Sequence, residues 1–253
     1  MLLLSLGGSG LALNTRCTDY SFKSRKDLFN DGTNFLVTPG DNDWNECFGY
    51  DISSNSDPIR EMWRGHFATE TSPFNQFSKD FPGGDRPTIY RQNPSNPENY
   101  FFSHNDVAFF GINKPSGSNY ISNKALVDIN EMWVEDRLGL DSTTCTFKSI
   151  VIIAHSWPKE SLYDKIDEYF DACGATLPIL SISGNTQPRT YCMTQNATST
   201  RVNVTVEAFE SGPLLISVVR DPDGGGDFFH VEDVDLTDSN RQCPSFSEGR
   251  YLE

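Results

Sequence analysis

Residues 35–47 read FLVTPGDNDWNEC, and this stretch sets the expectation for the fold. A short apolar run ends in a Pro-Gly pair, and Asp41, Asn42 and Asp43 follow without a spacer. That order is typical of a buried strand leading into a tight turn rich in oxygen ligands. Chemistry in open α/β sheets gathers at the carboxyl ends of strands. A second interpretation stays open, in which Asp41 or Asp43 only caps the next helix.

The segments before this turn predict a strand, a helix and a strand. Residues 1–13 fit either a signal peptide or a buried strand that runs into a Gly-rich turn. No positive charge precedes the apolar run, and a Gly-Gly-Ser-Gly stretch interrupts it, which favours the strand. Residues 18–32 carry apolar side chains at a rough helical spacing. Alternation of this kind predicts parallel strands joined by crossover helices.

The middle of the chain continues in the same style. Its patterns predict a helix over 58–67, a hairpin over 100–113 with its turn at 104–106, and a helix over 122–138. Residues 148–154 form the most strand-like run in the chain, and His155 follows it directly.

The last third predicts two further patterns. A helix over 161–173, ended by Gly174, precedes a buried strand over 176–182. From about residue 200, alternating stretches predict antiparallel strands, the last two joined by a turn at 221–224. We therefore expect one domain over residues 1–253, with antiparallel strands at about 200–237 and a tail at 238–253.

The charge of the chain limits its partners. It has 35 acidic and 20 basic side chains, a net charge of −15, and no basic patch that stands out. This balance argues against nucleic acid and against anionic membranes as partners. It would also repel a phosphorylated small molecule unless bound metal ions inverted the local field. No stretch reaches the roughly 18 apolar residues of a bilayer span, so we expect no membrane span.

Cysteines and glycosylation acceptors point to a compartment. The six cysteines include no CxxC pair, which disfavours a zinc knuckle. Acceptor tripeptides begin at Asn196 and at Asn203. Together these features favour an oxidising secretory compartment and a secreted glycoprotein with up to three disulfides. One pairing hypothesis is that Cys17 and Cys47 bridge the flanks of the Asp41 turn.

Three polar groups follow predicted buried strands: Asp41, His155 and the pair Asn185 and Gln187. A two-metal phosphoesterase needs ligands from several strand ends, because two divalent ions roughly 3.5–4 Å apart orient the phosphate and generate hydroxide. In these residues the chain resembles the calcineurin-like metallophosphoesterases. That family carries, in order, Asp-x-His, Gly-Asp, Gly-Asn-His-Asp/Glu, a lone His and Gly-His-x-His.

Four stretches carry the resemblance, one of them being Arg91-Gln92 and Pro97-Glu98-Asn99 with the predicted hairpin that follows. TPGDNDW at 38–44 resembles the third block, which an acidic branch of the family writes Pro-Gly-Asp-Asn-Glu-Trp. IVIIAHSWP at 150–158 resembles the lone-His block, and LSISGNTQPRTY at 180–191 resembles the last one. The resemblance covers about residues 4–220. It implies an α/β/β/α sandwich of two mixed sheets with flanking helices, without the usual first strand, because Asp-x-His has no counterpart here.

The resemblance also implies roles. Asp41 and His155 fall at metal-ligand positions, and Asp43 falls at the carboxylate that orients the catalytic group. Asn42 stands in place of the catalytic His, and an amide cannot shuttle a proton at neutral pH. Asn185 and Gln187 stand where the family has metal-binding histidines, and each offers a metal only a weak carbonyl oxygen.

The departures point to an impaired centre. Leu6-Gly7-Gly8 resembles the Leu-Gly-Asp block with its bridging Asp lost at Gly8. Only Asp41 and His155 remain strong donors, fewer than the three protein ligands of a catalytic zinc site. The resemblance therefore implies a phosphoesterase scaffold whose dinuclear centre has degenerated, weak or inactive as a hydrolase.

Two functions follow as expectations. The first is a secreted binding scaffold for a phosphorylated small molecule or a protein partner, with no metal bound. The second is an active metal-dependent phosphatase or phosphodiesterase that holds Zn, Mn or Fe and whose first metal block lies upstream of Met1.

Overall fold

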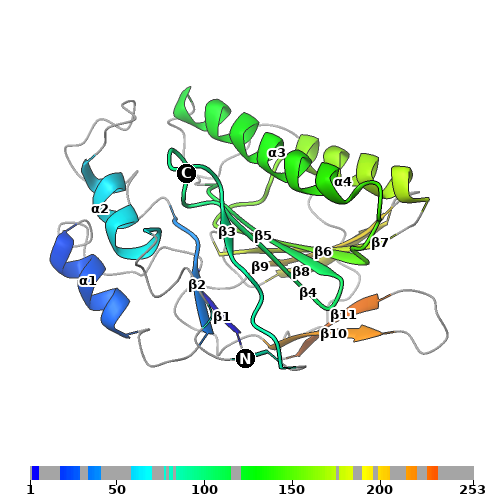
Figure 1. The fold of residues 1–253 in the computed structure, drawn as a ribbon, viewed down its shortest axis with the longest axis horizontal. Helices are drawn as coiled ribbons and strands as arrows, with labels where there is room; N and C mark the ends of the chain where they lie inside the picture. Colours follow the sequence, from blue (N-terminus) through cyan, green and yellow to red (C-terminus); the bar gives the residue numbers. More distant parts are fainter. Residues whose placement is uncertain are drawn as a thin grey trace.

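The computed structural model describes residues 2–5, 18–28, 34–40, 58–69, 77, 80–81, 84–114, 121–174, 177–184, 190–195, 199–205, 215–220 and 227–232. Within these residues the protein is α/β, as expected from the sequence (Figure 1). Its largest sheet has seven strands in the order β3-β4-β5-β6-β7-β9-β8, and two further sheets have two strands each. No described helix is long and apolar enough to cross a bilayer.

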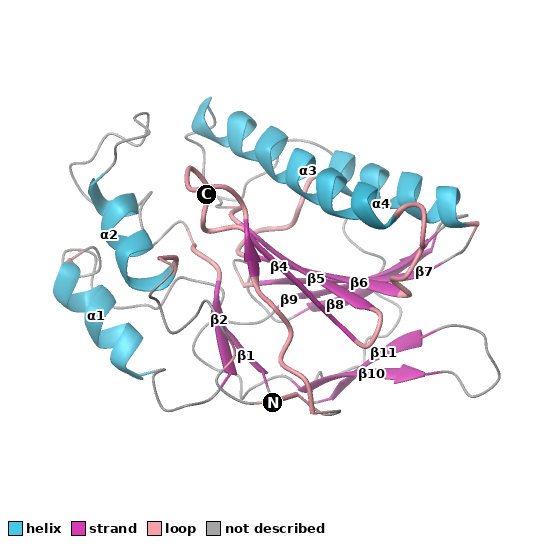
Figure 2. Ribbon diagram, in the orientation of Figure 1, coloured by secondary structure: helices cyan, strands magenta, loops and turns pink. Residues whose placement is uncertain are grey.

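The first described elements are a strand, a helix and a strand, as predicted. β1 (Leu2–Ser5) pairs in parallel with β2 (Asn34–Val37), and α1 (Asp19–Leu28) lies between them in the chain. α2 (Pro58–Phe67) follows with the predicted bounds. Phe22 of α1, Val37 of β2 and Trp63 of α2 share one buried cluster. The two helices therefore pack against one side of β2 (Figure 2).

The predicted hairpin is confirmed. β4 (Tyr100–His104) and β5 (Val107–Ile112) pair antiparallel, with β3 (Tyr90–Arg91) on the outer side of β4. Asn105 and Asp106 connect β4 and β5 with φ of 48° and 61°. Two positive φ angles give the twist that a two-residue hairpin loop needs, and Asn and Asp tolerate that conformation.

The centre of the large sheet is parallel. β5, β6 (Ser149–Ala154) and β7 (Leu177–Ser183) run side by side, joined by α3 (Ile121–Asp141) and α4 (Glu160–Cys173). Both helices cover the same face of the sheet (Figure 2). α4 ends as predicted at Gly174, whose φ of 63° is the left-handed conformation that favours glycine.

The C-terminal strands differ partly from the prediction. β9 (Ser199–Thr205) lies between β7 and β8 (Thr190–Gln195), parallel to β7 and antiparallel to β8. The expectation of purely antiparallel strands from about residue 200 was therefore wrong for the β7–β9 pair. β9 folds back on β8 as a hairpin and takes the inner position, so it meets β7 in the same direction. β10 (Leu215–Arg220) and β11 (Asp227–Glu232) are antiparallel, as expected.

The face of the large sheet opposite α3 and α4 packs against other strands. Leu36 of β2 lies in a cluster with Tyr100 and Phe102 of β4. Further along the same face, Phe229 of β11 packs against a cluster from β5, β6, β7 and β9 that includes Ile153. β2 and β11 therefore both meet the side of the sheet that the two long helices leave uncovered.

α2 is tied to the large sheet by a buried carboxylate. The side chain of Glu98, in the loop between β3 and β4, is fully buried and accepts a hydrogen bond of 2.8 Å from Nε of Arg60. Nη2 of Arg64 donates to both oxygens of Glu98, at 3.0 and 3.2 Å. Charge-assisted bonds of this kind compensate the cost of burying the carboxylate.

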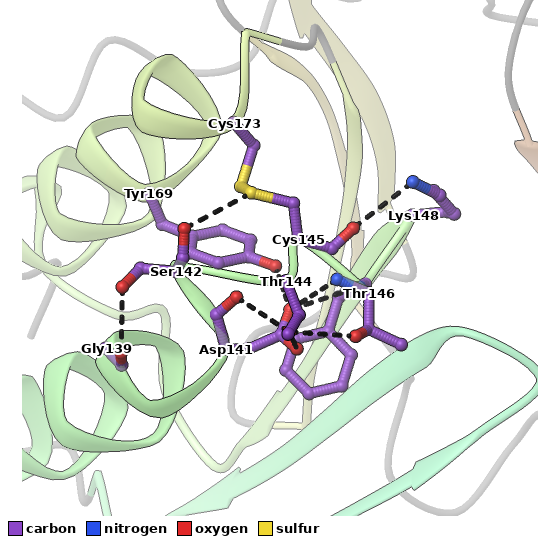
Figure 3. The surroundings of a disulfide bond; sticks show 10 residues. Gly139, Asp141, Ser142, Thr144, Cys145, Thr146, Lys148, Tyr169 and Cys173 are labelled. Carbon is purple, nitrogen blue, oxygen red and sulfur yellow. Dashed lines mark hydrogen bonds between the residues drawn. A yellow bond between two sulfur atoms is a disulfide. The ribbon is translucent and has the colours of Figure 1, made fainter.

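One disulfide lies within the described residues. Cys145, in the loop after α3, bonds to Cys173 at the end of α4, and their Cα atoms are 5.6 Å apart (Figure 3). Cys17 and Cys47 lie outside the described residues. Their pairing stays a prediction.

Candidate strand-end site

Most residues of the predicted site lie outside the described residues. These are Asp41, Asn42, Asp43, Asn185 and Gln187, and also the glycosylation acceptor Asn196. The structure describes the residues that directly precede two of these groups, Gly40 and Gly184, and it describes His155. The site is therefore built here from the ends of the strands that carry it.

His155 directly follows β6 and is 2% exposed. Alternation along β6 places Ile150 and Ile152 toward the helices and Val151 and Ile153 on the opposite side, so His155 is assigned to that opposite side. The backbone N–H of Gly184 donates to the carbonyl of His155 at 3.0 Å. The segments after β6 and β7 thus stay together beyond the sheet.

The end of β2 approaches this same side of the sheet. The hydroxyls of Thr38 and Tyr100 are hydrogen-bonded at 3.2 Å. Tyr100 is fully buried beside Gly111 of β5, and a Cβ at Gly111 would overlap its ring. Burial raises the pKa of Tyr100 to about 12, although the bond to Thr38 acts in the opposite direction. The Tyr100 side chain therefore contacts both Gly111, near the end of β5, and Thr38, which lies three residues before Asp41.

Asn113, which directly follows β5, is a polar strand-end residue that the sequence reasoning did not single out. Its backbone N–H donates to Oδ1 of Asn99 at 2.6 Å, and its carbonyl accepts from Nδ2 of Asn130 at 3.0 Å. Nδ2 of Asn99 in turn donates to Oδ1 of Asn130 at 2.7 Å. The backbone of Asn113 is held from both sides by amides. The signal that marked His155, a polar residue directly after a buried strand, also marks Asn113.

The side chain of Asn113 is only 2% exposed, and neither its Nδ2 nor its Oδ1 has a hydrogen-bond partner in the described part of the chain. Alternation along β5 assigns it to the same side as His155. The backbone N–H of Ser156 donates to the carbonyl of Lys114 at 3.0 Å, so the segments after β5 and β6 also stay adjacent.

The helix-facing side of the same strand end holds a small, half-open pocket. Ile112, Lys114 and Lys159 are among its lining residues, and Asn113 is not, as expected if Asn113 faces the opposite side. Burial and the nearby charge of Lys159 lower the pKa of Lys114 to about 8. Glu131 also lines this pocket, so the pocket carries charges of both signs.

The described strand ends offer hydrogen-bonding groups rather than a metal cluster. Asn113 contributes an amide and His155 an imidazole, whereas the buried Ser183 pairs with Ala154 and is assigned by alternation to the helix-facing side. Within the described residues no group of three or more His, Cys, Asp or Glu side chains could hold a metal ion. The other predicted ligands lie outside the described residues, and we derive no catalytic step through a metal centre.

Of the two predicted glycosylation acceptors, Asn203 lies within the described residues. It belongs to β9, between β7 and β8, and is 8% exposed. Such burial disfavours a glycan on the folded strand, because a glycan is bulky and needs the surface. Glycosylation itself stays a prediction at both positions.

Comparison of the chain with protein-family models, with curated proteins and with solved structures gives no match.

Proposed function

We propose that the protein is a relative of the calcineurin-like metallophosphoesterases whose dinuclear metal centre has degenerated, and that it binds a small polar ligand at the strand ends instead of hydrolysing a phosphoester. Its cysteines and the acceptor tripeptide at Asn196 support a place in the secretory pathway.

The bond from Gly184 to the carbonyl of His155 carries the proposal. The lone-His segment and the segment that begins with Ser183-Gly184 come from two predicted motifs, and this bond holds them side by side. The contact between Thr38 and Tyr100 brings the end of β2, which precedes the third motif, toward the same side. Three fragments that resemble family blocks thus come from strands that end near one another.

The layers of the fold support the resemblance. α1 and α2 pack on one side of β2, and β2 packs on the large sheet through Leu36. α3 and α4 cover the other face of the large sheet. This order of helices, the β1–β2 pair, the large sheet and helices supports the proposed α/β/β/α sandwich.

The residue types support loss of metal rather than retention. Amides at 185 and 187 and a glycine at 8 stand where the family places histidines and a bridging carboxylate. A neutral amide keeps a hydrogen-bonding shape but holds a divalent cation weakly. Without the bridging carboxylate, two cations near each other would repel strongly.

Metal analysis and turnover test the proposal. The purified chain, incubated with Zn, Mn or Fe and then freed of excess ions, should hold clearly less than one equivalent of metal. It should hydrolyse an aryl phosphate monoester or diester no faster than the variant Asp41→Ala. Asp128→Asn on the exposed side of α3 is the control for general effects of a lost carboxylate. Stoichiometric metal together with turnover that Asp41→Ala abolishes would contradict the proposal and favour an active hydrolase.

A further inference from the structure

The side-chain amide of Asn113 is buried and lacks hydrogen-bond partners within the described residues. An asparagine amide has two donor hydrogens and a carbonyl acceptor, and burial without partners costs free energy. Asn113 is only 2% exposed, and within the described residues neither its Nδ2 nor its Oδ1 has a hydrogen-bond partner. Buried polar groups in native proteins are nearly always bonded, so a group left open in this way points to a missing partner.

Asn130 shows the contrast within the same network. It is 3% exposed, and its Oδ1 and Nδ2 both form hydrogen bonds, to Asn99 and to the carbonyl of Asn113. Asn99 and Asn130 therefore use their amides to fix the backbone of Asn113, whose own amide is left over. The backbone that carries this side chain is held from both sides, and an open polar group on a fixed backbone is typical of a preorganised binding group.

The place of Asn113 agrees with this role. It follows one of four adjacent parallel strands, and in α/β sheets ligands bind outside the carboxyl ends of such strands. Because so little of the residue is exposed, its amide is shielded from bulk water.

We propose that Asn113 binds the ligand of this strand-end site through a paired donor and acceptor, the pattern of a nucleobase edge or of a primary carboxamide. A metal ion or an oxyanion would satisfy only one of the two amide atoms. A ligand edge with an N–H beside an acceptor satisfies both in one bidentate contact, as asparagine does with adenine. The inference rests on the proposed function, since it names the ligand chemistry of the same site.

The stability of ligand-free variants tests the premise. Asn113→Leu replaces an amide without partners by an apolar side chain of similar size, so its Tm should rise by about 2–4 °C. Asn130→Leu removes a bonded amide of equal burial, so its Tm should fall. A fall in Tm for Asn113→Leu as large as that for Asn130→Leu would show that the Asn113 amide is already bonded, by ordered water for example, and would overturn the inference.

Calorimetric titration tests the ligand class. Adenosine, cytidine and nicotinamide are titrated into the whole chain with excess EDTA, each beside its N,N-dimethylated form, which keeps the acceptor but lacks the donor. At least one parent compound should bind, and its affinity should fall by about tenfold or more on dimethylation and again on Asn113→Leu. Binding of adenosine or cytidine alone would identify the ligand as a nucleobase, and binding of nicotinamide alone would identify it as a primary carboxamide.

Two results overturn the inference: no binding by any of the three parent compounds, or binding that Asn113→Leu leaves unchanged. The EDTA separates this test from that of the proposed function. Metal-dependent turnover by the protein would refute the proposal of a degenerate metal centre, but it would not change the result of the titration in EDTA. An inactive protein that ignores these ligands would refute the role of Asn113 alone.

Discussion

At the scale of single residues, Gly111 is a position where the fold tolerates little change. It lies opposite Tyr100 in the β4–β5 pair, and the Tyr100 ring occupies the space that a Cβ would need. Gly111→Ala must displace a fully buried ring and its bond to Thr38, so we expect the free energy of unfolding to fall by about 2–3 kcal/mol. Urea unfolding followed by fluorescence measures this loss.

Gly139 supplies the matched control for that substitution. It lies in α3, and nothing stands within 4 Å of the position of its Cβ. Gly139→Ala should therefore raise stability, by about 0.5–1 kcal/mol at most, because alanine favours the helix. If Gly111→Ala proved as harmless as Gly139→Ala, the contact between Tyr100 and β5 would be wrong, and with it the route that brings β2 to the strand ends.

The sequence predicts an individual site residue only where a local pattern marks it. His155 stood out because a continuous apolar run ends directly before it, and the structure places it at a strand end. The sequence VAFFGIN at 107–113 predicts only a strand followed by an ordinary turn, so it does not mark Asn113 as a site residue. Its special state depends on Asn99 and Asn130, which are 14 and 17 residues away in the chain, and no local pattern reveals such contacts.

At the scale of elements, the end of α3 is fixed by one carboxylate. Asp141 accepts hydrogen bonds from the Thr144 hydroxyl at 2.6 Å, from the Thr146 N–H at 2.6 Å and from the Tyr169 hydroxyl of α4 (Figure 3). Partial burial acts to raise the pKa of Asp141, but these bonds and one from Phe147 N–H outweigh it and lower the pKa below its usual value.

The lowered pKa gives the sign of a pH dependence. A carboxyl whose pKa is lower in the folded state adds stability above its unfolded pKa of about 3.9, and that part is lost as the pH falls through the folded pKa. Asp141→Asn should therefore cost about 1–2 kcal/mol at neutral pH, and the difference from the unmodified protein should shrink below about pH 4.

Urea unfolding at several pH values checks this expectation. Asp128→Asn, an exposed carboxyl on the same helix, is the control and should change stability little at any pH. A deficit for Asp141→Asn that stayed constant down to acid pH would mean that the charge of Asp141 does not hold the turn.

Elements with a strong local signal were predictable, and those defined by distant partners were not. The bounds of α2 and the stop of α4 at Gly174 followed from a Pro start and a Gly end. β8, with the sequence TYCMTQ, has neither alternation nor a long apolar run, and it exists because β9 pairs with it. The parallel pairing of β7 with β9 likewise depends on a distant contact, because either strand of the β8–β9 hairpin could have paired with β7.

At the scale of the whole molecule, the Cys145–Cys173 disulfide acts mainly on the unfolded chain. It closes a loop of 28 residues that contains all of β6 and nearly all of α4. Restricting a loop of this length lowers the entropy of the unfolded state by an amount worth about 3–4 kcal/mol. The same bond fits the oxidising compartment expected from the sequence.

Replacing both cysteines by serine should therefore lower the free energy of unfolding by about 3 kcal/mol and the Tm by roughly 6–12 °C, with the fold retained. Scanning calorimetry of the double variant measures the change, and each single variant is a control because it loses the same cross-link and should match the double variant. The substitution acts on the chain itself, so the result does not depend on reducing other disulfides. A double variant as stable as the parent would show that the bond does not form in the folded protein.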